Sequence, residues 1–421
     1  MNKNSELSIY KDEYIHKELE ITNSINDEYI LIINPYKSNN NRSFGTKIGS
    51  KLVDIYIGDN FEKISKYEYS ICFKDENCIK MLFSELQTDG IAIKKVLYLC
   101  AYSDGKNSYI ENMDNGLYNL VNIINALNYH GLKETIELIV CFDGTANNSM
   151  YYQALSGLSK SLKKENTKIL LRTCDLCEQQ YGSEEFIRTI KKEIIFSNCV
   201  DSIKYENGKR FAKEYRKIKE LPHKVQKIKS TGVYAIIGGM GGIGTELAKY
   251  LKSNYNCTIV LIGRRNHSQI YESIGEYIRL DICDEKNTES AFESIIHKYG
   301  KIDGIFHCAG VCIDKLLKNK TCFDVEQVVS SKTIGLINLI KEVKKYGNGF
   351  IICFSSLAAV TGNVGQCDYA YANAFMDACS QKYDNIYSIN WGLWKSGNMG
   401  KTEIIKENLK NEFGVLPIEN Q

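Results

Sequence analysis

The feature that most constrains the fold is a run of five glycines within seven residues, Gly238–Gly244 (GGMGGIG). It follows Val233–Ile237, an apolar run that reads as a buried strand, and precedes Ile243–Leu251, which has helical spacing. Residues without side chains permit a sharp turn and let a pyrophosphate approach the amide groups at the helix start. The alternative is a structural glycine turn without a ligand. The predicted phosphate-binding residues are Gly238, Gly239, Gly241, Gly242, Ile243 and Gly244.

The residues after this turn continue the same pattern. Short apolar runs that read as strands alternate with stretches of helical spacing, which is typical of a parallel sheet covered by helices. The further predicted strands are Thr258–Ile262, Tyr277–Leu280, Ile302–His307, Phe350–Phe354 and Ile386–Ile389. We therefore expect an α/β protein whose second half is a doubly wound parallel Rossmann sheet.

The first half has similar layering but no glycine-rich turn after any predicted strand. Its predicted strands are Tyr29–Ile33, Val53–Ile57, Val96–Cys100, Ile136–Phe142 and Lys168–Leu171, with a helix at Leu117–Leu127. This half is therefore expected to be an α/β layer without a nucleotide site. The predicted joint is Lys213–Lys229, which is rich in Lys and Arg and contains Pro222. A solvated linker or exposed helix is the favoured interpretation of the joint, and a phosphate-binding segment is the alternative.

Composition excludes several classes of function. The chain has 421 residues and a formal net charge of +2, which argues against a nucleic-acid binder. No stretch reaches the roughly 18 apolar residues that a membrane-spanning helix needs. Fifteen cysteines without regular spacing indicate reduced thiols and a cytoplasmic protein. Cys174 and Cys177 have no second cysteine pair or paired histidines nearby, so no metal site is expected.

The end of the second predicted strand indicates which dinucleotide is bound. Arg264 and Arg265 follow Gly263, where an acidic residue would bind the free ribose hydroxyls of NAD. Two arginines instead suit a 2′-phosphate, which favours NADPH; two merely exposed arginines are the alternative. Asp281, after the third strand, either accepts a hydrogen bond from the adenine amine or caps a turn or helix.

A group of hydroxyl and amide side chains follows the strand at Phe350–Phe354. Ser356 and Tyr369 are thirteen residues apart, and Asn373 lies one helical turn after Tyr369. A hydroxyl that polarises a ketone and a phenol that gives up a proton are the minimal groups for reducing a carbonyl by hydride. Because the free phenol has a pKa near 10, a nearby lysine ammonium is expected to help it.

At this point the chain from Thr231 to Met399 resembles the short-chain dehydrogenase/reductase superfamily. More narrowly, it resembles the ketoreductase domains of modular polyketide synthases. The similar segments are Gly238–Gly244, Leu261–Arg265, Leu280–Asp284, His307–Val311, Phe354–Ser356, Gly365–Asp377 and Asn390–Trp394. Most of the superfamily has a Lys four residues after the Tyr, where this chain has Asn373. Polyketide ketoreductases place the Lys upstream, and Lys332, 24 residues before Ser356, stands there.

The resemblance implies a set of site residues and a domain organisation. The implied catalytic residues are Tyr369, Ser356, Lys332 and Asn373, and the implied cofactor contacts include Asp281, Ile282, Ala309 and Gly310. Residues 1–226 are implied to be a truncated Rossmann-like structural subdomain without cofactor, and residues 227–421 the NADPH-binding ketoreductase subdomain. Phe413–Gln421 resembles the start of the tail that leads to the next synthase domain.

The function implied is NADPH-dependent reduction of a β-ketoacyl thioester to a β-hydroxyacyl thioester. The substrate is carried by the phosphopantetheine arm of an acyl carrier protein, with neighbouring synthase domains as further partners. One alternative is a stand-alone 3-oxoacyl carrier-protein reductase, against which the long first half argues. Another is a non-catalytic reductase-like scaffold, against which the complete catalytic set argues.

Four residues are candidates for guiding the substrate. Ketoreductases that give a D-configured hydroxyl resemble one another in an Asp three residues after HxAGV, here Asp314. They also lack a Trp eight residues before the Tyr, where this chain has Thr361, so the D product is expected. Trp391 and Trp394 either line the substrate channel or fill the core.

His307 ends a predicted strand. A half-buried histidine near the cofactor, with its hydrogen bonds satisfied, is favoured over a catalytic base.

Overall fold

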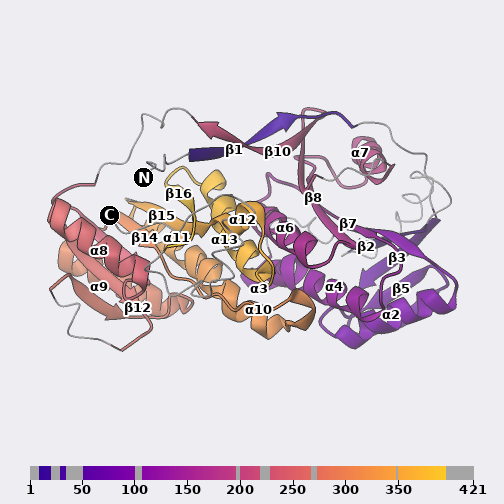
Figure 1. Cartoon of the computed structure of the whole chain (residues 1–421), viewed down its shortest axis with the longest axis horizontal. Coiled ribbons are helices and arrows are strands. Elements are labelled where there is room, and N and C mark those ends of the chain that lie inside the picture. The colour runs from indigo at the N-terminus through magenta and orange to yellow at the C-terminus, as the bar shows by residue number, and fades with distance from the viewer. Residues whose placement is uncertain are drawn as a thin grey trace, which may run out of the picture. The chain divides into compact units, whose positions relative to one another are not determined.

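The computed structural model describes residues 9–19, 29–34, 51–99, 107–195, 200–218, 228–266, 273–347 and 349–394. The tail Phe413–Gln421 and the residues 219–227 of the predicted joint lie outside these ranges. The chain divides into two compact units, Met1–Gln226 and Lys227–Gln421 (Figure 1).

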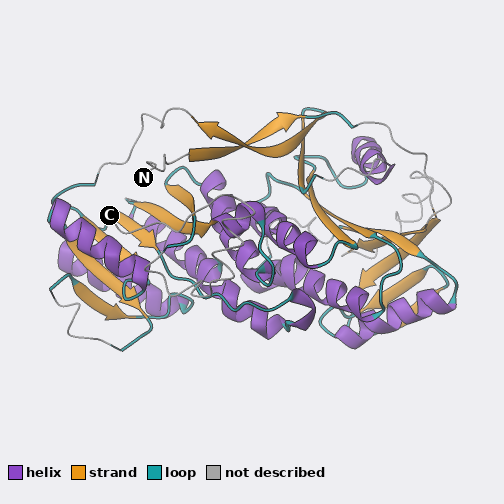
Figure 2. Ribbon diagram, in the orientation of Figure 1, coloured by secondary structure: helices purple, strands orange, loops and turns teal. Residues whose placement is uncertain are grey.

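The second unit is built on a parallel sheet of six strands in the order β13-β12-β11-β14-β15-β16 (Figure 2). The strands are β11 (Val233–Ile237), β12 (Thr258–Gly263), β13 (Glu276–Arg279), β14 (Gly304–His307), β15 (Phe350–Ser356) and β16 (Ile386–Trp391). The chain extends the sheet from β11 in one direction and then from β14 in the other. Ligands of open α/β sheets bind at such a reversal, outside the carboxyl ends of the strands. The predicted doubly wound fold is therefore confirmed.

Helices connect these strands and carry their own start and stop signals. Those of the second unit are α8 (Gly242–Tyr255), α9 (Glu285–Tyr299), α10 (Cys322–Val329), α11 (Ile334–Tyr346), α12 (Leu357–Thr361) and α13 (Cys367–Lys382). Two short 3-10 turns, η3 (Leu317–Asn319) and η4 (Ser330–Lys332), flank α10. The Asp284 side chain caps the start of α9 by accepting a hydrogen bond from Asn287 N. Gly300 and Gly347, both with positive φ, end α9 and α11.

The first unit contains a mixed sheet of ten strands in the order β1-β10-β9-β8-β7-β6-β2-β3-β5-β4. Its strands are β1 (Ile9–His16), β2 (Tyr29–Asn34), β3 (Lys51–Ile57), β4 (Glu62–Ser65), β5 (Glu68–Ile71), β6 (Ile93–Tyr98), β7 (Ile136–Phe142), β8 (Ile169–Asp175), β9 (Ser202–Glu206) and β10 (Lys209–Ile218). Its helices are α2 (Glu76–Thr88), α3 (Tyr109–Met113), α4 (Asn119–Tyr129), α5 (Ser149–Gln153), α6 (Leu155–Glu165) and α7 (Glu184–Ile195), and a π-helical turn, η1 (Asp114–Tyr118), joins α3 to α4. The central strands are parallel, as the alternating pattern predicted.

One prediction for this unit is wrong. The segment Lys213–Lys229 was expected to be a linker or exposed helix, but residues 213–218 belong to β10, which pairs antiparallel with β1. The reason is cross-strand charge pairing: Lys213 Nζ lies 2.8 Å from Asp12 Oδ2. Lys213, the first of the basic residues, is thus paired with a strand about 200 residues away, which no local pattern reveals.

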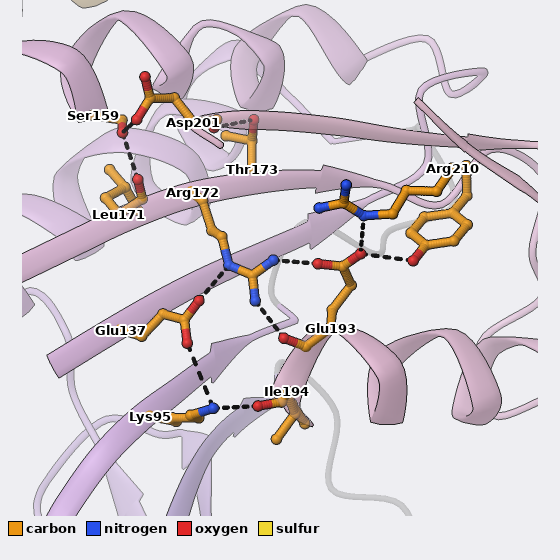
Figure 3. A network of polar contacts seen from close by, with 11 residues as sticks. Lys95, Glu137, Ser159, Leu171, Arg172, Thr173, Glu193, Ile194, Asp201 and Arg210 are labelled. Atoms are coloured by element: carbon orange, nitrogen blue, oxygen red, sulfur yellow. Dashed lines mark hydrogen bonds and ion pairs between the residues drawn. The ribbon is translucent and has the colours of Figure 1, made fainter. Parts of the chain in front are cut away.

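A cluster of buried charged side chains lies inside the first unit (Figure 3). Figure 3 shows the Arg172 guanidinium between two carboxylates, those of Glu137 and Glu193. Glu193 also accepts hydrogen bonds from Tyr205 OH at 2.6 Å and from Arg210 Nε at 2.7 Å. Its carboxylate is therefore shared by residues of β8, β9 and β10, and the positive charge around it holds its pKa below the usual value.

Two findings bear on the classes excluded from composition. In the described residues, no helix is both long and apolar enough to cross a bilayer. The thirteen cysteines within those ranges are free thiols, and no group of metal-binding side chains is found among them or the other described residues.

Candidate active site

The glycine turn between β11 and α8 has room for backbone only. Gly238 has a φ of +77°, and a Cβ there would lie 2.8 Å from Ala309 N. A Cβ at Gly244 would lie 2.4 Å from Gly238 O, so the helix start could not approach the strand end as it does. The turn is closed by hydrogen bonds from Gly241 N to Gly238 O and from Gly238 N to Ile262 O, at 2.8 and 2.7 Å.

The same turn fits a dinucleotide pyrophosphate. Gly241, the N-cap of α8, has no side chain with which to bond the amide groups of the first turn. Those amides lie at the positive end of a 14-residue helix, at the point where the strand order reverses. Ala309 and Gly310 follow β14 after Cys308, and Ala309 lies against this turn, since a Cβ at Gly238 would be 2.8 Å from Ala309 N. The predicted phosphate-binding glycines and these two residues are thus brought together.

Three arginines meet at the ends of β12 and β13. The Arg264 side chain is 65% exposed, and its Nη1 lies 3.8 Å from Asp281 Oδ2. Asp281 Oδ1 accepts a hydrogen bond from Cys283 N at 3.0 Å, the turn-capping role that the sequence left open. Arg265 O accepts a hydrogen bond from Tyr277 OH at 2.6 Å. Arg279, which the sequence argument missed, donates from Nε to Arg264 O at 3.3 Å; its register opposite Gly263 places it there.

The hydroxyl and phenol predicted for catalysis lie on adjoining elements. Ser356 ends β15, and its Oγ accepts a hydrogen bond from Ala358 N at 3.2 Å. Tyr369 stands in the first turn of α13 and is half-buried. Burial raises the pKa of Tyr369 to about 12, although hydrogen bonding from Ser356 and Asn373 opposes the rise. A phenol is protonated at neutral pH even at its free pKa near 10, and burial strengthens this preference.

Asn373 lies one turn further along α13, as its spacing predicts. Its Nδ2 donates a hydrogen bond to Tyr369 O at 2.7 Å. Its Oδ1 is buried and finds no hydrogen-bond partner among the described residues. A buried acceptor without a partner destabilises the protein, so this oxygen is a site where a water or a ligand could donate a hydrogen bond.

Lys332 is buried at the carboxyl end of β15. Only 2% of the residue is exposed, and its Nζ donates a hydrogen bond to Phe354 O at 2.9 Å, two residues before Ser356. Burial lowers the pKa of Lys332 to about 8, against the opposing influence of neighbouring thiols and of Asp377. Gly310 makes the position possible, because a Cβ there would lie 2.6 Å from Lys332 Cε.

His307 lies deeper than expected. It is fully buried rather than half-buried, and its Nε2 lies 3.0 Å from Ser331 O. Burial, together with the charge of Lys332, lowers the pKa of His307 to about 3. The buried Nδ1 finds no hydrogen-bond partner among the described residues, so the favoured interpretation of a satisfied histidine holds for one ring nitrogen only.

The candidate guiding residues occupy two places. Asp314 lies in the loop after β14, and its Oδ1 accepts hydrogen bonds from Gln366 Nε2 at 2.8 Å and Cys312 Sγ at 3.0 Å. Thr361 ends α12 and donates from Oγ1 to Leu357 O at 3.0 Å. Trp391 stacks on Phe354 with ring centres 5.6 Å apart, and Trp394 meets Trp391 edge-on at 5.2 Å. Trp391 packs against the core of the sheet.

Sequence reasoning missed a buried ion pair beside Tyr369. Lys320 Nζ lies 2.5 Å from Asp368 Oδ2, and the two side chains are 0% and 1% exposed. The residues are 48 positions apart, so only the fold brings them together. The available signal was Asp368 itself, an acidic residue directly before the predicted catalytic tyrosine.

Comparisons with known proteins identify the family. Residues 232–396 match the family described as KR domain, and residues 28–193 match the family described as beta-ketoacyl synthase-like, N-terminal. The second unit belongs to the KR domain family. The resemblance to ketoreductase domains of modular polyketide synthases is thereby confirmed.

The relatives of this KR-containing chain are much longer proteins. It is 30% identical over 292 residues to polyketide synthase PksN of Bacillus subtilis, covering 63% of this chain and 5% of the relative. It is 26% identical over 365 residues to polyketide synthase PksM of the same organism, covering 83% of this chain and 8% of the relative. The chain thus spans less than a tenth of the curated relatives described here.

A solved structure extends the likeness of fold to both units. The crystal structure of an N-terminal ketoreductase from the macrolactin assembly line has a TM-score of 0.79 and 23% identity. The similarity covers 92% of this chain and 83% of that one. The ten-stranded first unit is therefore part of the same architecture.

Proposed function

We propose that this KR domain reduces the β-keto group of an acyl thioester with NADPH and gives a D-configured β-hydroxyl. The thioester is carried on the phosphopantetheine arm of an acyl carrier protein, within a cytoplasmic synthase. The observation that carries the proposal is that Lys332 is buried beside the end of β15 while Asn373 lies one turn after Tyr369. Neither residue suits a plain structural core.

The glycine turn and the arginines support the choice of cofactor. The amides of the first turn of α8 would hold the pyrophosphate, and Arg264 with Arg265 would hold the 2′-phosphate. Ile282, Ala309 and Gly310 line the remainder of the cofactor site. When bound there, NADPH supplies the hydride for the carbonyl carbon.

The side chains of this chain handle the proton and the oxygen. Ser356 donates a hydrogen bond to the carbonyl oxygen of the substrate and polarises it. Tyr369, a phenol whose pKa burial raises to about 12, gives its proton to that oxygen. The Lys332 ammonium stabilises the phenolate that is left, and Asn373 Oδ1 accepts a hydrogen bond from the water or ammonium that returns the proton.

The stereochemical part of the proposal concerns where the substrate enters. Asp314 projects from the loop after β14, which is tied to the residues before Tyr369. Thr361, the last residue of α12, has a much smaller side chain than a Trp at this position would have. A 100:1 product ratio needs a difference of only about 2.7 kcal/mol between the two approaches. Contacts of this loop with the phosphopantetheine arm are sufficient for that.

The experiment uses the full chain with NADPH and the N-acetylcysteamine thioester of 3-oxopentanoic acid. We expect consumption of NADPH and, by chiral chromatography, a predominantly D product. The matched control is Tyr369→Phe, which keeps the ring but lacks the proton donor. Its turnover should fall about 10²–10⁴-fold while NADPH still binds. A predominantly L product would contradict the stereochemical assignment, and equal turnover in the control would contradict the role of Tyr369.

The same experiment tests one alternative, and the fold argues against the other. A non-catalytic scaffold would consume no NADPH with the thioester or with the same acid on a phosphopantetheine-bearing carrier protein. A stand-alone reductase would have no use for the first unit, whose fold the ketoreductase from the macrolactin assembly line shares.

A further inference from the structure

The loop between β14 and α10 is joined to the start of α13 by contacts that the reaction proposed above does not use. We name residues 312–320 the guide loop, since it contains Asp314. Lys320 ends this loop, and its Nζ donates hydrogen bonds to Ile313 O at 2.8 Å and to Asp368 Oδ2 at 2.5 Å. One ammonium group therefore holds both the beginning of the guide loop and the first turn of α13.

Asp368, the second member of this ion pair, is bonded to the backbone of Tyr369. The second oxygen of Asp368, Oδ1, accepts a hydrogen bond from Tyr369 N at 2.8 Å. Gln366, two residues earlier, donates from Nε2 to Asp314 Oδ1 at 2.8 Å. A backbone hydrogen bond of 3.0 Å from Lys315 N to Gly365 O also joins the guide loop to the residues before α13. The guide loop and the predicted proton donor are thus fixed to each other from both sides.

Stability alone does not account for this arrangement. The two charged side chains are completely buried, and removing charges from water costs several kcal/mol per ion. An apolar pair of similar volume is often as stable as a buried ion pair, or more stable. An apolar pair makes no directional hydrogen bonds. It has no donor for the Ile313 carbonyl and no acceptor for the Tyr369 amide.

We propose that Lys320, Asp368 and Gln366 are positioning residues that set the place of Asp314 relative to Tyr369. They thereby decide which face of the ketone meets the hydride. This inference rests on the proposed ketoreductase function and adds to it the residues that control the hand of the product. None of the three touches the reacting atoms in this proposal, since each acts through Asp314 or through Tyr369.

The test replaces the ion pair by an apolar pair. Lys320→Met/Asp368→Leu removes both buried charges together, so that neither is left unpaired. Full-length protein is assayed with NADPH and the N-acetylcysteamine thioester of 3-oxopentanoic acid. The assay measures kcat, the KM for NADPH and the ratio of D to L product. Lys318→Met is the matched control, because Lys318 is exposed on the same loop.

We expect the double variant to lose at least about tenfold in product ratio and about 10- to 100-fold in kcat, because small misplacements of reacting groups have effects of this size. Its KM for NADPH and its binding stoichiometry should be unchanged. Partial unfolding would lower the number of active molecules but would leave the product ratio of the remainder unaltered. Wild-type kcat and product ratio in a folded double variant would overturn the proposal.

A second variant keeps the test decisive if the double variant does not fold. Gln366→Met removes one hydrogen bond and no charge, and it should shift the product ratio in the same direction by a smaller factor. An unchanged ratio in this variant would overturn the proposal. If the wild type itself reduces no thioester, the proposed function fails. Amide exchange then tests the positioning contacts directly: the guide loop must exchange faster in either variant than in the wild type, and equal exchange refutes them.

Discussion

Replacing Lys332 by Met is expected to stabilise the second unit while it removes the ammonium that we propose assists reduction. The lysine is buried, and its Nζ donates hydrogen bonds to the Phe354 carbonyl at 2.9 Å and to Met376 Sδ at 4.0 Å. Methionine has nearly the same length and volume, so the variant removes the charge without opening a cavity. Activity and stability should therefore change in opposite directions.

The magnitude follows from the pKa. Burial lowers the pKa of Lys332 from 10.5 to about 8, and each pH unit corresponds to about 1.4 kcal/mol. Keeping this side chain charged at pH 7 thus costs the folded state about 3 kcal/mol. The variant also loses the hydrogen bond to Phe354 O, which destabilises it by about 1 kcal/mol. The variant should be more stable than the wild type by about 2 kcal/mol at pH 7.

The sign of the pH dependence is fixed by the same shift. Between pH 8 and 10.5 the unfolded wild type binds more protons at Lys332 than the folded wild type does. Its free energy of unfolding therefore rises with pH in this window, as linkage requires. Methionine does not titrate. The difference in free energy of unfolding between the variant and the wild type should therefore shrink from pH 7 to pH 10 and disappear.

The assay is urea unfolding followed by tryptophan fluorescence. The chain has two Trp residues, 391 and 394, and both lie in the second unit, so the signal reports that unit alone. Lys318→Met, an exposed lysine in the same unit, is the control and should change stability by less than about 0.5 kcal/mol. A Lys332→Met protein that is less stable at pH 7, or whose difference from the wild type does not vary with pH, would refute the reasoning.

Three further predictions concern the cofactor site and the first unit. Arg264→Ala or Arg265→Ala should weaken NADPH about ten- to a hundredfold and leave NADH nearly unchanged in equilibrium titrations; equal losses for both cofactors would contradict the 2′-phosphate role. Gly244→Ala should weaken both cofactors about equally, by ten- to a hundredfold or so, because the overlap with Gly238 O distorts the turn. Glu193→Gln should lower the stability of the first unit by about 3–5 kcal/mol in calorimetry. Glu206→Gln, whose carboxylate is 48% exposed, should cost less than about 1 kcal/mol, and similar losses in both would be inconsistent with the buried cluster.

Local signals in the sequence predicted the second unit well. The glycine turn, the strand before it and the helix after it are neighbours along the chain, and buried parallel strands have a strong apolar pattern. Tyr369 and Asn373 are one helical turn apart, so their shared face also follows from spacing. Lys332 could be singled out only through the resemblance, because nothing local distinguishes it from an exposed helical lysine.

Long-range contacts account for what the sequence did not predict. The charged ribbon of β1 and β10, the Arg172 cluster and the Lys320–Asp368 pair each join residues that are far apart along the chain. In the last two, charged side chains are buried, which is the environment opposite to the one that their residue types favour. Periodicity describes one element at a time, so it assigns such residues to solvent.

The pairing of β1 with β10 has a consequence for synthesis on the ribosome. Tyr14 lies opposite Lys213, so β1 is made about 200 residues before its partner. At about 5–20 residues per second, it waits roughly 10–40 s with its backbone unpaired. Lys11, Asp12 and Glu13 are consecutive charged residues in that strand, and charges on a strand edge discourage pairing with the wrong chain. The first unit thus finishes folding only after nearly all of it has emerged, and its earliest strand is the last to be incorporated.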